Sequence, residues 1–296
     1  MTNSRPNCSG GPVGTAGAIR RNRGAAPILD YVSFSGKLKD EGRRKKPLEY
    51  WYKYRSDLWK KVTIYDHGES QTYHPRKPDA DEKLKSNIRR AARMIEGYAL
   101  CNQWSWFGTF TLNPEYRDRA DLDCFRADLM QFIRDCRKKY GDIEALFVPE
   151  LHKAKDGWHM HGLLQGIPVD ALRAFTLKER LPKYIREKIK KGEPVFDWPA
   201  YRDSFGWVDM EPIRSRDAAA RYITKYITKA GDSTAQALEL GKHLYYVTRG
   251  LQQPERIETE NEPGAVPDSF PGSGLVEGHS FDFDYGFVQW YERPHR

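Results

Sequence analysis

Apolar side chains recur along the chain with two different periods, and each period predicts a different kind of element. A spacing of three or four positions predicts an amphipathic helix, whereas short apolar or alternating runs predict strands. Helices are expected over residues 79–100, 121–140, 178–191 and 215–230. Strands are expected over residues 106–112, 143–152, 158–166, 205–213 and 243–248. Helices interspersed with strands predict an α+β fold with a largely antiparallel sheet.

The two central strands are expected to pair as a hairpin around an Asp-Gly turn at residues 156–157. A two-residue turn there places His152 opposite His161 and Glu150 opposite Leu163. A four-residue loop keeps the same parity, whereas a three-residue bulged loop breaks it. Since residues i and i+2 of a strand share a face, one face of the hairpin then carries Glu150, His152, His159 and His161.

Imidazoles and a carboxylate on one face form a candidate divalent-metal site. This donor set suits Mg²⁺ or Mn²⁺ and leaves coordination positions open for substrate oxygens. The candidate ligands are His159, His161 and Glu150, with His152 as the alternative third ligand. The competing interpretation is a pair of unrelated histidines, because a His-x-His sequence is common by itself.

The predicted helix at residues 215–230 contains a doubled Tyr-x-x-Lys pattern. Tyr222 and Tyr226 are four positions apart and share a face, and Lys225 and Lys229 each follow one of them by three positions. A tyrosine hydroxyl can attack phosphorus, and a neighbouring lysine favours the phenolate of a group whose pKa is ordinarily about 10. A separate apolar stripe anchors the helix, made of Ala219, Ala220, Ile223, Ile227 and Ala230. The plainer interpretation is that the rings pack together with their hydroxyls in water.

The charge of the chain indicates an anionic partner, with nucleic acid first. The 296 residues include 49 Lys and Arg against 41 Asp and Glu, a formal net charge of +8. Cations and aromatic rings are interleaved in residues 36–61, as in grooves for single-stranded nucleic acid. A solvated arm whose rings pack on the domain would have the same composition. The candidate DNA-binding residues are Arg43, Arg44, Lys45, Lys46, Lys183, Arg186 and Lys190.

The sequence disfavours two classes of protein. No segment approaches the ~18–20 apolar residues that a membrane span needs, so no membrane partner is expected. Residues 1–27 hold no apolar leader, so a cytoplasmic location is expected. The chain also has no P-loop sequence, which argues against a nucleotide-driven motor.

Three motifs gain a joint meaning when they are taken in chain order. The strand motif FGTFTL at residues 107–112 precedes His159-Met160-His161, and the doubled tyrosine motif follows at residues 222–229. This order resembles the HUH endonuclease superfamily, specifically the rolling-circle replication initiators (Rep proteins) of small phages and plasmids. The resemblance covers roughly residues 100–250. It implies a ferredoxin-like fold, with the histidines on a central strand of an antiparallel sheet.

The resemblance also implies an activity, namely a nickase that cuts one DNA strand at a replication origin. One tyrosine would attack the phosphodiester and become a 5′-phosphotyrosine, and the freed 3′-OH would prime a host polymerase. A second tyrosine allows a later cleavage and rejoining, and a host helicase would unwind the duplex. In this interpretation Glu150 looks like the acidic third metal ligand of viral Rep proteins. A bacterial cytoplasm is the implied location.

Composition and resemblance together divide the chain into four segments. Residues 1–35 are expected to be a flexible tail and residues 36–100 a basic, aromatic arm with a helix. Residues 101–250 are expected to be the endonuclease domain, and residues 251–296 an acidic linker with an aromatic end. That end, residues 281–291, is expected as an edge strand or a docking tail.

Three other functions remain open on the sequence. A single-strand transposase or a relaxase would use the same histidines and tyrosines on other DNA partners. A non-catalytic single-stranded DNA-binding protein would account for the charge and the aromatic rings, but not for the shared face of Glu150, His159 and His161. A metal phosphoesterase that uses water would retain the hairpin and make the tyrosines dispensable.

Overall fold

The computed structural model describes residues 48–64, 79–152, 157–229, 243–257, 265–271, 275–283 and 286–293. Arg43, Arg44, Lys45 and Lys46 lie outside the described residues, as do residues 1–35 and the side chain of Lys229. Among the described residues, no helix is long and apolar enough to cross a membrane.

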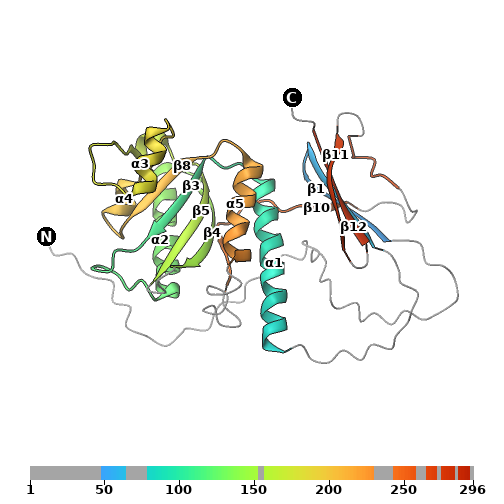
Figure 1. Ribbon diagram of the computed structural model, residues 1–296, viewed down its shortest axis with the longest axis horizontal. Coiled ribbons are helices and arrows are strands. Elements are labelled where there is room, and N and C mark those ends of the chain that lie inside the picture. The colour runs from blue at the N-terminus through green and yellow to red at the C-terminus, as the bar shows by residue number, and fades with distance from the viewer. Residues whose placement is uncertain are drawn as a thin grey trace.

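The described chain forms two antiparallel sheets with helices, so the predicted α+β class is confirmed (Figure 1). The larger sheet has the strand order β6-β7-β8-β3-β5-β4-β9. Its strands are β3 (Trp106–Thr111), β4 (Glu144–Leu151), β5 (Trp158–Gln165), β6 (Arg173–Ala174), β7 (Phe196–Asp197), β8 (Val208–Pro212) and β9 (Tyr246–Val247). The helices are α1 (Ala80–Cys101), α2 (Leu122–Tyr140), α3 (Lys183–Lys190), α4 (Pro199–Arg202) and α5 (Arg216–Lys229), with a 3₁₀ turn at Val169–Ala171.

The two faces of the larger sheet are covered by different helices. Phe110 of β3 meets Tyr201 edge-on, and both Tyr201 and Trp198 pack on Phe132 of α2. Phe107 of the same strand points the other way, because alternate residues of a strand face opposite sides. It contacts the tyrosines of α5. Helix α2 therefore closes the hydrophobic core on one face, and α5 lies on the other.

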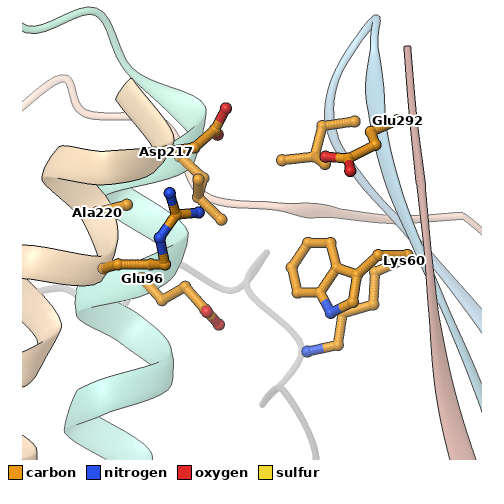
Figure 2. A pocket seen from close by; sticks show the side chains of 9 residues that line it. Lys60, Glu96, Asp217, Ala220 and Glu292 are labelled. Carbon is orange, nitrogen blue, oxygen red and sulfur yellow. The ribbon is translucent and has the colours of Figure 1, made fainter. Parts of the chain in front are cut away.

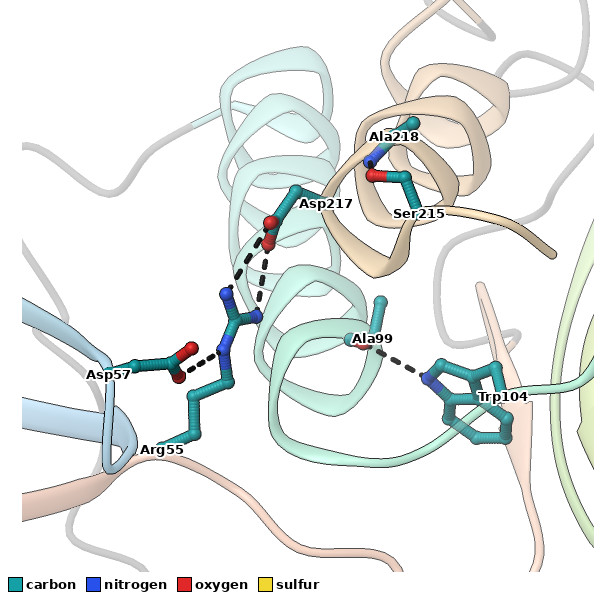
Figure 3. Close-up of polar contacts among 7 residues, drawn as sticks. All are labelled: Arg55, Asp57, Ala99, Trp104, Ser215, Asp217 and Ala218. Carbon is teal, nitrogen blue, oxygen red and sulfur yellow. Dashed lines mark hydrogen bonds and ion pairs between the residues drawn. The ribbon is translucent and has the colours of Figure 1, made fainter. Parts of the chain in front are cut away.

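The boundaries of the tyrosine helix follow its sequence closely. Ser215 accepts a hydrogen bond from the backbone N–H of Ala218 at 3.2 Å, which confirms the expected N-cap (Figure 3). Ala219, Ala220, Ile223 and Ile227 are buried, as the apolar stripe predicted. Helix α3 is shorter than expected, because Pro182 takes the N-cap position and residues 178–181 precede the helix in turns and coil.

The smaller sheet unites segments that the sequence analysis kept apart. Its order is β10-β1-β2-β12-β11. The strands are β1 (Leu48–Arg55), β2 (Leu58–Ile64), β10 (Glu255–Ile257), β11 (Val276–Phe283) and β12 (Gly286–Glu292). Strand β12 lies between β2 and β11, so most of the aromatic C-terminal segment is inside the sheet, not at its edge. Residues 48–61 of the predicted arm are likewise largely strand. The domain boundaries themselves stay a prediction.

Helix α1 connects the two sheets through a shared core. Tyr54 and Trp290 of the smaller sheet are buried in the same apolar cluster as Ile95 of α1 and the side chains of the larger sheet. Beside this core, a cleft of about 250 Å³ lies between the smaller sheet and helices α1 and α5 (Figure 2). Its lining combines both charges, with Lys60 and Glu96 among its residues. Lys60 Nζ lies 4.9 Å from the centre of the Trp290 ring, and burial lowers the pKa of this ammonium group.

An ion pair joins the smaller sheet to the start of the tyrosine helix (Figure 3). The guanidinium of Arg55 donates to Asp217 at 3.0 and 3.4 Å, and to Asp57 at 2.7 Å. Asp217 lies in the first turn of α5, where a carboxylate also complements the helix dipole. The side chain of Arg55 is largely buried. The pair therefore helps to fix the end of α5 that precedes the tyrosines.

Arg55→Ala is expected to lower the free energy of unfolding by about 1–2 kcal/mol, because it leaves Asp217 without its charged partner. Urea denaturation measures the change. Arg134→Ala, on the exposed surface of α2, is the matched control and is expected to cost less than ~0.5 kcal/mol. The exchanged pair Arg55→Asp with Asp217→Arg is expected to recover part of the loss. An Arg55→Ala effect no larger than the control would show that the pair contributes nothing.

Candidate active site

The hairpin of β4 and β5 has a different register from the predicted one but keeps its parity. Glu150 lies opposite His159, not opposite Leu163, and Leu151 lies opposite Trp158. The backbone N–H of His152 donates to Gly157 at 2.8 Å, so the connection is longer than a two-residue Asp-Gly turn. Residues 153–156 of this connection lie outside the described residues. Because the sums of the paired numbers stay odd, the carboxylate and the imidazoles remain on one face.

Both imidazoles of the His-x-His motif are held through Nδ1 by threonines of the neighbouring strand β3. Thr111 Oγ1 and His159 Nδ1 are joined by a hydrogen bond of 2.7 Å, and Thr109 Oγ1 lies 3.4 Å from His161 Nδ1. These pairs lie directly opposite one another in the β3–β5 register. Such contacts fix the ring orientation and leave Nε2 as the nitrogen that points away from β3.

The contacts of Nε2 bring the carboxylate into the same site. His161 Nε2 donates to Glu150 Oε2 at 2.7 Å. His161 is buried, whereas the Glu150 side chain is partly exposed. The His152 and His159 rings have centroids 5.1 Å apart, and His152 is exposed. The structure therefore groups all of the predicted candidate ligands and places Glu150 closest to His161.

His159 is electrically neutral at physiological pH. Burial, with smaller effects from His161 and His152, lowers its pKa from 6.5 to about 4. A neutral imidazole is the form that binds a metal ion. Its protonation state thus fits a role as ligand.

The lowered pKa of His159 makes a prediction about stability. Between pH 6.5 and about 4 the unfolded chain binds a proton at this residue and the folded chain does not. The resulting pH dependence lowers the free energy of unfolding as the pH falls through this interval, and stability is unaffected by this group above pH 6.5. We expect His159→Gln to show a shallower loss of stability across this interval, measured by urea denaturation in EDTA. Equal slopes for both proteins would contradict the assigned pKa.

The donors fit the divalent ion that the resemblance implies, although their present contacts are not those of a filled site. Among the described residues, no three His, Cys, Asp or Glu side chains already lie in a metal-binding arrangement. The nitrogen of His161 that would bind an ion donates to Glu150 instead. Imidazole nitrogens and a carboxylate oxygen nevertheless match the preferences of Mg²⁺ and Mn²⁺. Binding would exchange this hydrogen bond for contacts of both groups with the ion.

The tyrosines of α5 lie directly over the histidine row. The Tyr226 ring stacks on His161 with a centroid distance of 3.6 Å and an interplanar angle of 13°. Tyr222 meets Tyr226 edge-on at 5.3 Å and Phe107 at 5.1 Å. The helix therefore presents both phenols to the sheet face that carries Glu150.

The two phenols have different environments. Burial raises the pKa of Tyr226 well above its ordinary value, and a hydrogen bond with Tyr222 raises it further. Tyr222 is 46 % exposed. Lys225 is also exposed, and its Nζ lies 5.8 Å from the centre of the Tyr222 ring. Tyr222 is thus the phenol that a strand of DNA reaches from solvent, with a cation beside it.

The predicted DNA-binding residues that the structure describes lie on α3. Lys183, Arg186 and Lys190 belong to this helix, and Lys183 and Arg186 are exposed on it. The sequence analysis missed two side chains of the same helix that turn toward β8: the Tyr184 hydroxyl donates to Asp209, and Lys188 donates to Glu211. It also missed the roles of the threonines of β3, although their alternation in the FGTFTL strand was a usable signal.

Comparison with known proteins gives one family match. Residues 105–231 match a family model of replication-associated proteins, described by the name ORF2. The matched segment begins just before β3 and ends just after α5, so it contains the threonines, the histidine hairpin and the tyrosine helix. Searches of curated proteins and of solved structures give no match.

Proposed function

We propose that this chain, whose residues 105–231 form a rolling-circle Rep-type domain of the ORF2 family of replication-associated proteins, initiates replication by nicking one DNA strand. The substrate would be single-stranded DNA at a replication origin. Such a protein would leave a 3′-OH for a host polymerase and rely on a host helicase for unwinding.

One observation carries this proposal: the two phenols of α5 lie over the histidine and carboxylate row. Tyr226 stacks on His161 at 3.6 Å, and His161 donates to Glu150 at 2.7 Å. A plain binding protein has no need for nucleophiles and metal-ligand types on one face of its sheet. A phosphodiester placed there would meet both groups at once.

The chemistry that we propose is covalent catalysis by tyrosine. The Tyr222 hydroxyl attacks the phosphorus, the P–O3′ bond breaks, and the 5′ end of the cut strand stays on the tyrosine. The exposure of Tyr222 favours it as the first nucleophile, and its neighbour Lys225 would offset phosphate charge. Tyr226, in hydrogen-bond contact with Tyr222, would act in the second transfer that rejoins the strand.

A divalent ion, Mg²⁺ or Mn²⁺, would be held by His159, His161 and Glu150 and would supply Lewis-acid polarisation of the phosphate. The protein's own part is to keep the site ordered. Thr109 and Thr111 hold the imidazoles through Nδ1, and burial keeps His159 neutral. Stacking on His161 holds the ring of Tyr226 in place.

A cleavage assay tests the proposed activity. The full-length protein is incubated with single-stranded circular DNA of its own replicon, with Mn²⁺ or with EDTA. We expect linear product only with the metal ion. Binding without any cleavage of this DNA would favour the non-catalytic single-stranded DNA-binding function. A transposase or relaxase would cut by the same chemistry but prefer a DNA hairpin of another element, so competition between hairpins and origin DNA separates these functions.

A further inference from the structure

Helix α3 carries an aromatic residue whose hydroxyl is anchored beside the catalytic face. The Tyr184 hydroxyl donates to Asp209 Oδ1 at 2.8 Å, and the indole N–H of Trp207 donates to the same oxygen at 3.2 Å. Asp209 is only 3 % exposed. A buried carboxylate with aromatic donors on one oxygen fixes where those donors lie.

The sheet register places this anchor in line with a candidate metal ligand. Asp209 of β8 lies opposite Thr109 of β3, and Thr109 lies opposite His161 of β5. Paired residues of adjacent strands share a face, and strands are ~4.8 Å apart, so Asp209 lies roughly 10 Å from His161 across the sheet. The Tyr184 side chain therefore reaches the face on which Tyr226 also lies, from the side opposite α5.

The ring of Tyr184 is held in place and yet available to a ligand. Tyr184 is 46 % exposed although its hydroxyl is hydrogen-bonded. An aromatic ring that is oriented before binding loses little conformational entropy when a partner stacks on it. Neither the apolar cluster of Ile185 nor the larger core includes Tyr184. The exposed ring is thus not explained by packing.

The charge around this ring favours an anionic strand. Residues 178–191 hold seven cations against two carboxylates, and Lys183 and Arg186 are exposed on α3. The nearby Glu211 is paired with Lys188. Proteins that bind single-stranded DNA combine cations for the phosphates with aromatic rings for the bases, and both kinds of group are present here.

We propose that Tyr184 is a stacking subsite for a nucleobase of single-stranded DNA, close to the phosphodiester that is cut. This inference rests on the proposed function, because it needs a DNA strand on the catalytic face. In this arrangement α5 presents the nucleophiles on one side, and α3 holds the flanking base on the other. Asp209 acts as a positioning residue, since it contacts Tyr184 and not the DNA.

The test uses photocrosslinking and binding with the full-length Tyr222→Phe/Tyr226→Phe protein, which cannot form the proposed covalent link. The probe is an oligothymidylate of about 20 nucleotides with 5-iodouracil, which crosslinks to aromatic rings stacked on it. We expect a crosslink at Tyr184 by mass spectrometry. Adding Tyr184→Leu is expected to weaken binding about tenfold, as for the loss of one stacked base.

Two further variants separate stacking from folding. Tyr184→Phe keeps the ring and loses the hydroxyl, so it is expected to bind within about threefold of the parent protein. Tyr140→Leu, on α2 at the opposite face of the sheet, is the matched control and is expected to leave binding unchanged. Thermal unfolding checks that each variant is folded. Equally weakened binding in Tyr184→Phe and Tyr184→Leu would assign the effect to the Asp209 contact and overturn the stacking subsite.

The outcomes distinguish this inference from the function on which it rests. Retained binding with no crosslink at Tyr184 and no loss in Tyr184→Leu would overturn the subsite alone. Failure of the protein to bind the oligonucleotide would count against the proposed function and the subsite together. A crosslink at Tyr184 with a tenfold loss of affinity would support the subsite whether or not the protein cleaves DNA.

Discussion

Replacing both Tyr222 and Tyr226 by phenylalanine is expected to reduce cleavage of single-stranded DNA by more than about 1000-fold while binding stays within about threefold. The rings that pack on Phe107 and His161 remain in the double variant, and only the hydroxyls that attack phosphorus are lost. Cleavage rates at saturating protein, together with affinity measured by fluorescence anisotropy, give both values. Cleavage that survives in the double variant would contradict covalent catalysis and favour a phosphoesterase that uses water.

The single variants test the order of the nucleophiles. Tyr222 is exposed, whereas Tyr226 is stacked on His161 and has a raised pKa. We therefore expect Tyr222→Phe to lose most of the first cleavage, and Tyr226→Phe to retain it but fail to rejoin the strand. Tyr140→Phe, on the opposite face of the sheet, is the matched control. The reverse pattern would assign the first attack to Tyr226.

His161→Ala is expected to reduce metal-dependent cleavage by at least about 100-fold, with little change in DNA affinity. This substitution removes a candidate metal ligand, the partner of Glu150 and the surface on which Tyr226 stacks. Cleavage rates over a Mn²⁺ titration measure the loss. A rate that recovers at high Mn²⁺ would indicate a weakened metal site, and a rate that does not would indicate lost positioning of Tyr226.

His243→Ala is the matched control for His161→Ala, because His243 is an exposed histidine outside the catalytic face. His161 is buried, so thermal unfolding of both variants must show that they are folded. If His161→Ala remains folded and cleaves DNA as the control does, the histidine row has no catalytic role.

The shared face of the histidines was predictable because strand parity is local. Alternation alone places His159 and His161 together, and any odd pairing sum adds Glu150 and His152. The register was not predictable in the same way. It depends on the length of the connection after His152, and the Asp-Gly signal at residues 156–157 indicated a shorter turn than the one that the pairing of Leu151 with Trp158 allows.

The rest of the fold and site depends on contacts between distant segments. Strand β12 pairs with β2, so that Val288 lies opposite Val62, and no local pattern specifies such a partner. The position of Asp209 beside the catalytic face likewise follows from the pairing of β8 with β3. In the sequence it is one acidic residue among many. Only the sheet shows that Tyr184, 25 residues earlier, is anchored to it.

Mapping of the covalent adduct tests the central claim most directly. The full-length protein is incubated with Mn²⁺ and single-stranded circular DNA of its own replicon, denatured, digested with nuclease and protease, and analysed by mass spectrometry. We expect a nucleotide linked through its 5′-phosphate to the peptide that contains Tyr222, and no such product in EDTA. Cleaved DNA without an adduct on Tyr222 or Tyr226 would contradict the proposed mechanism.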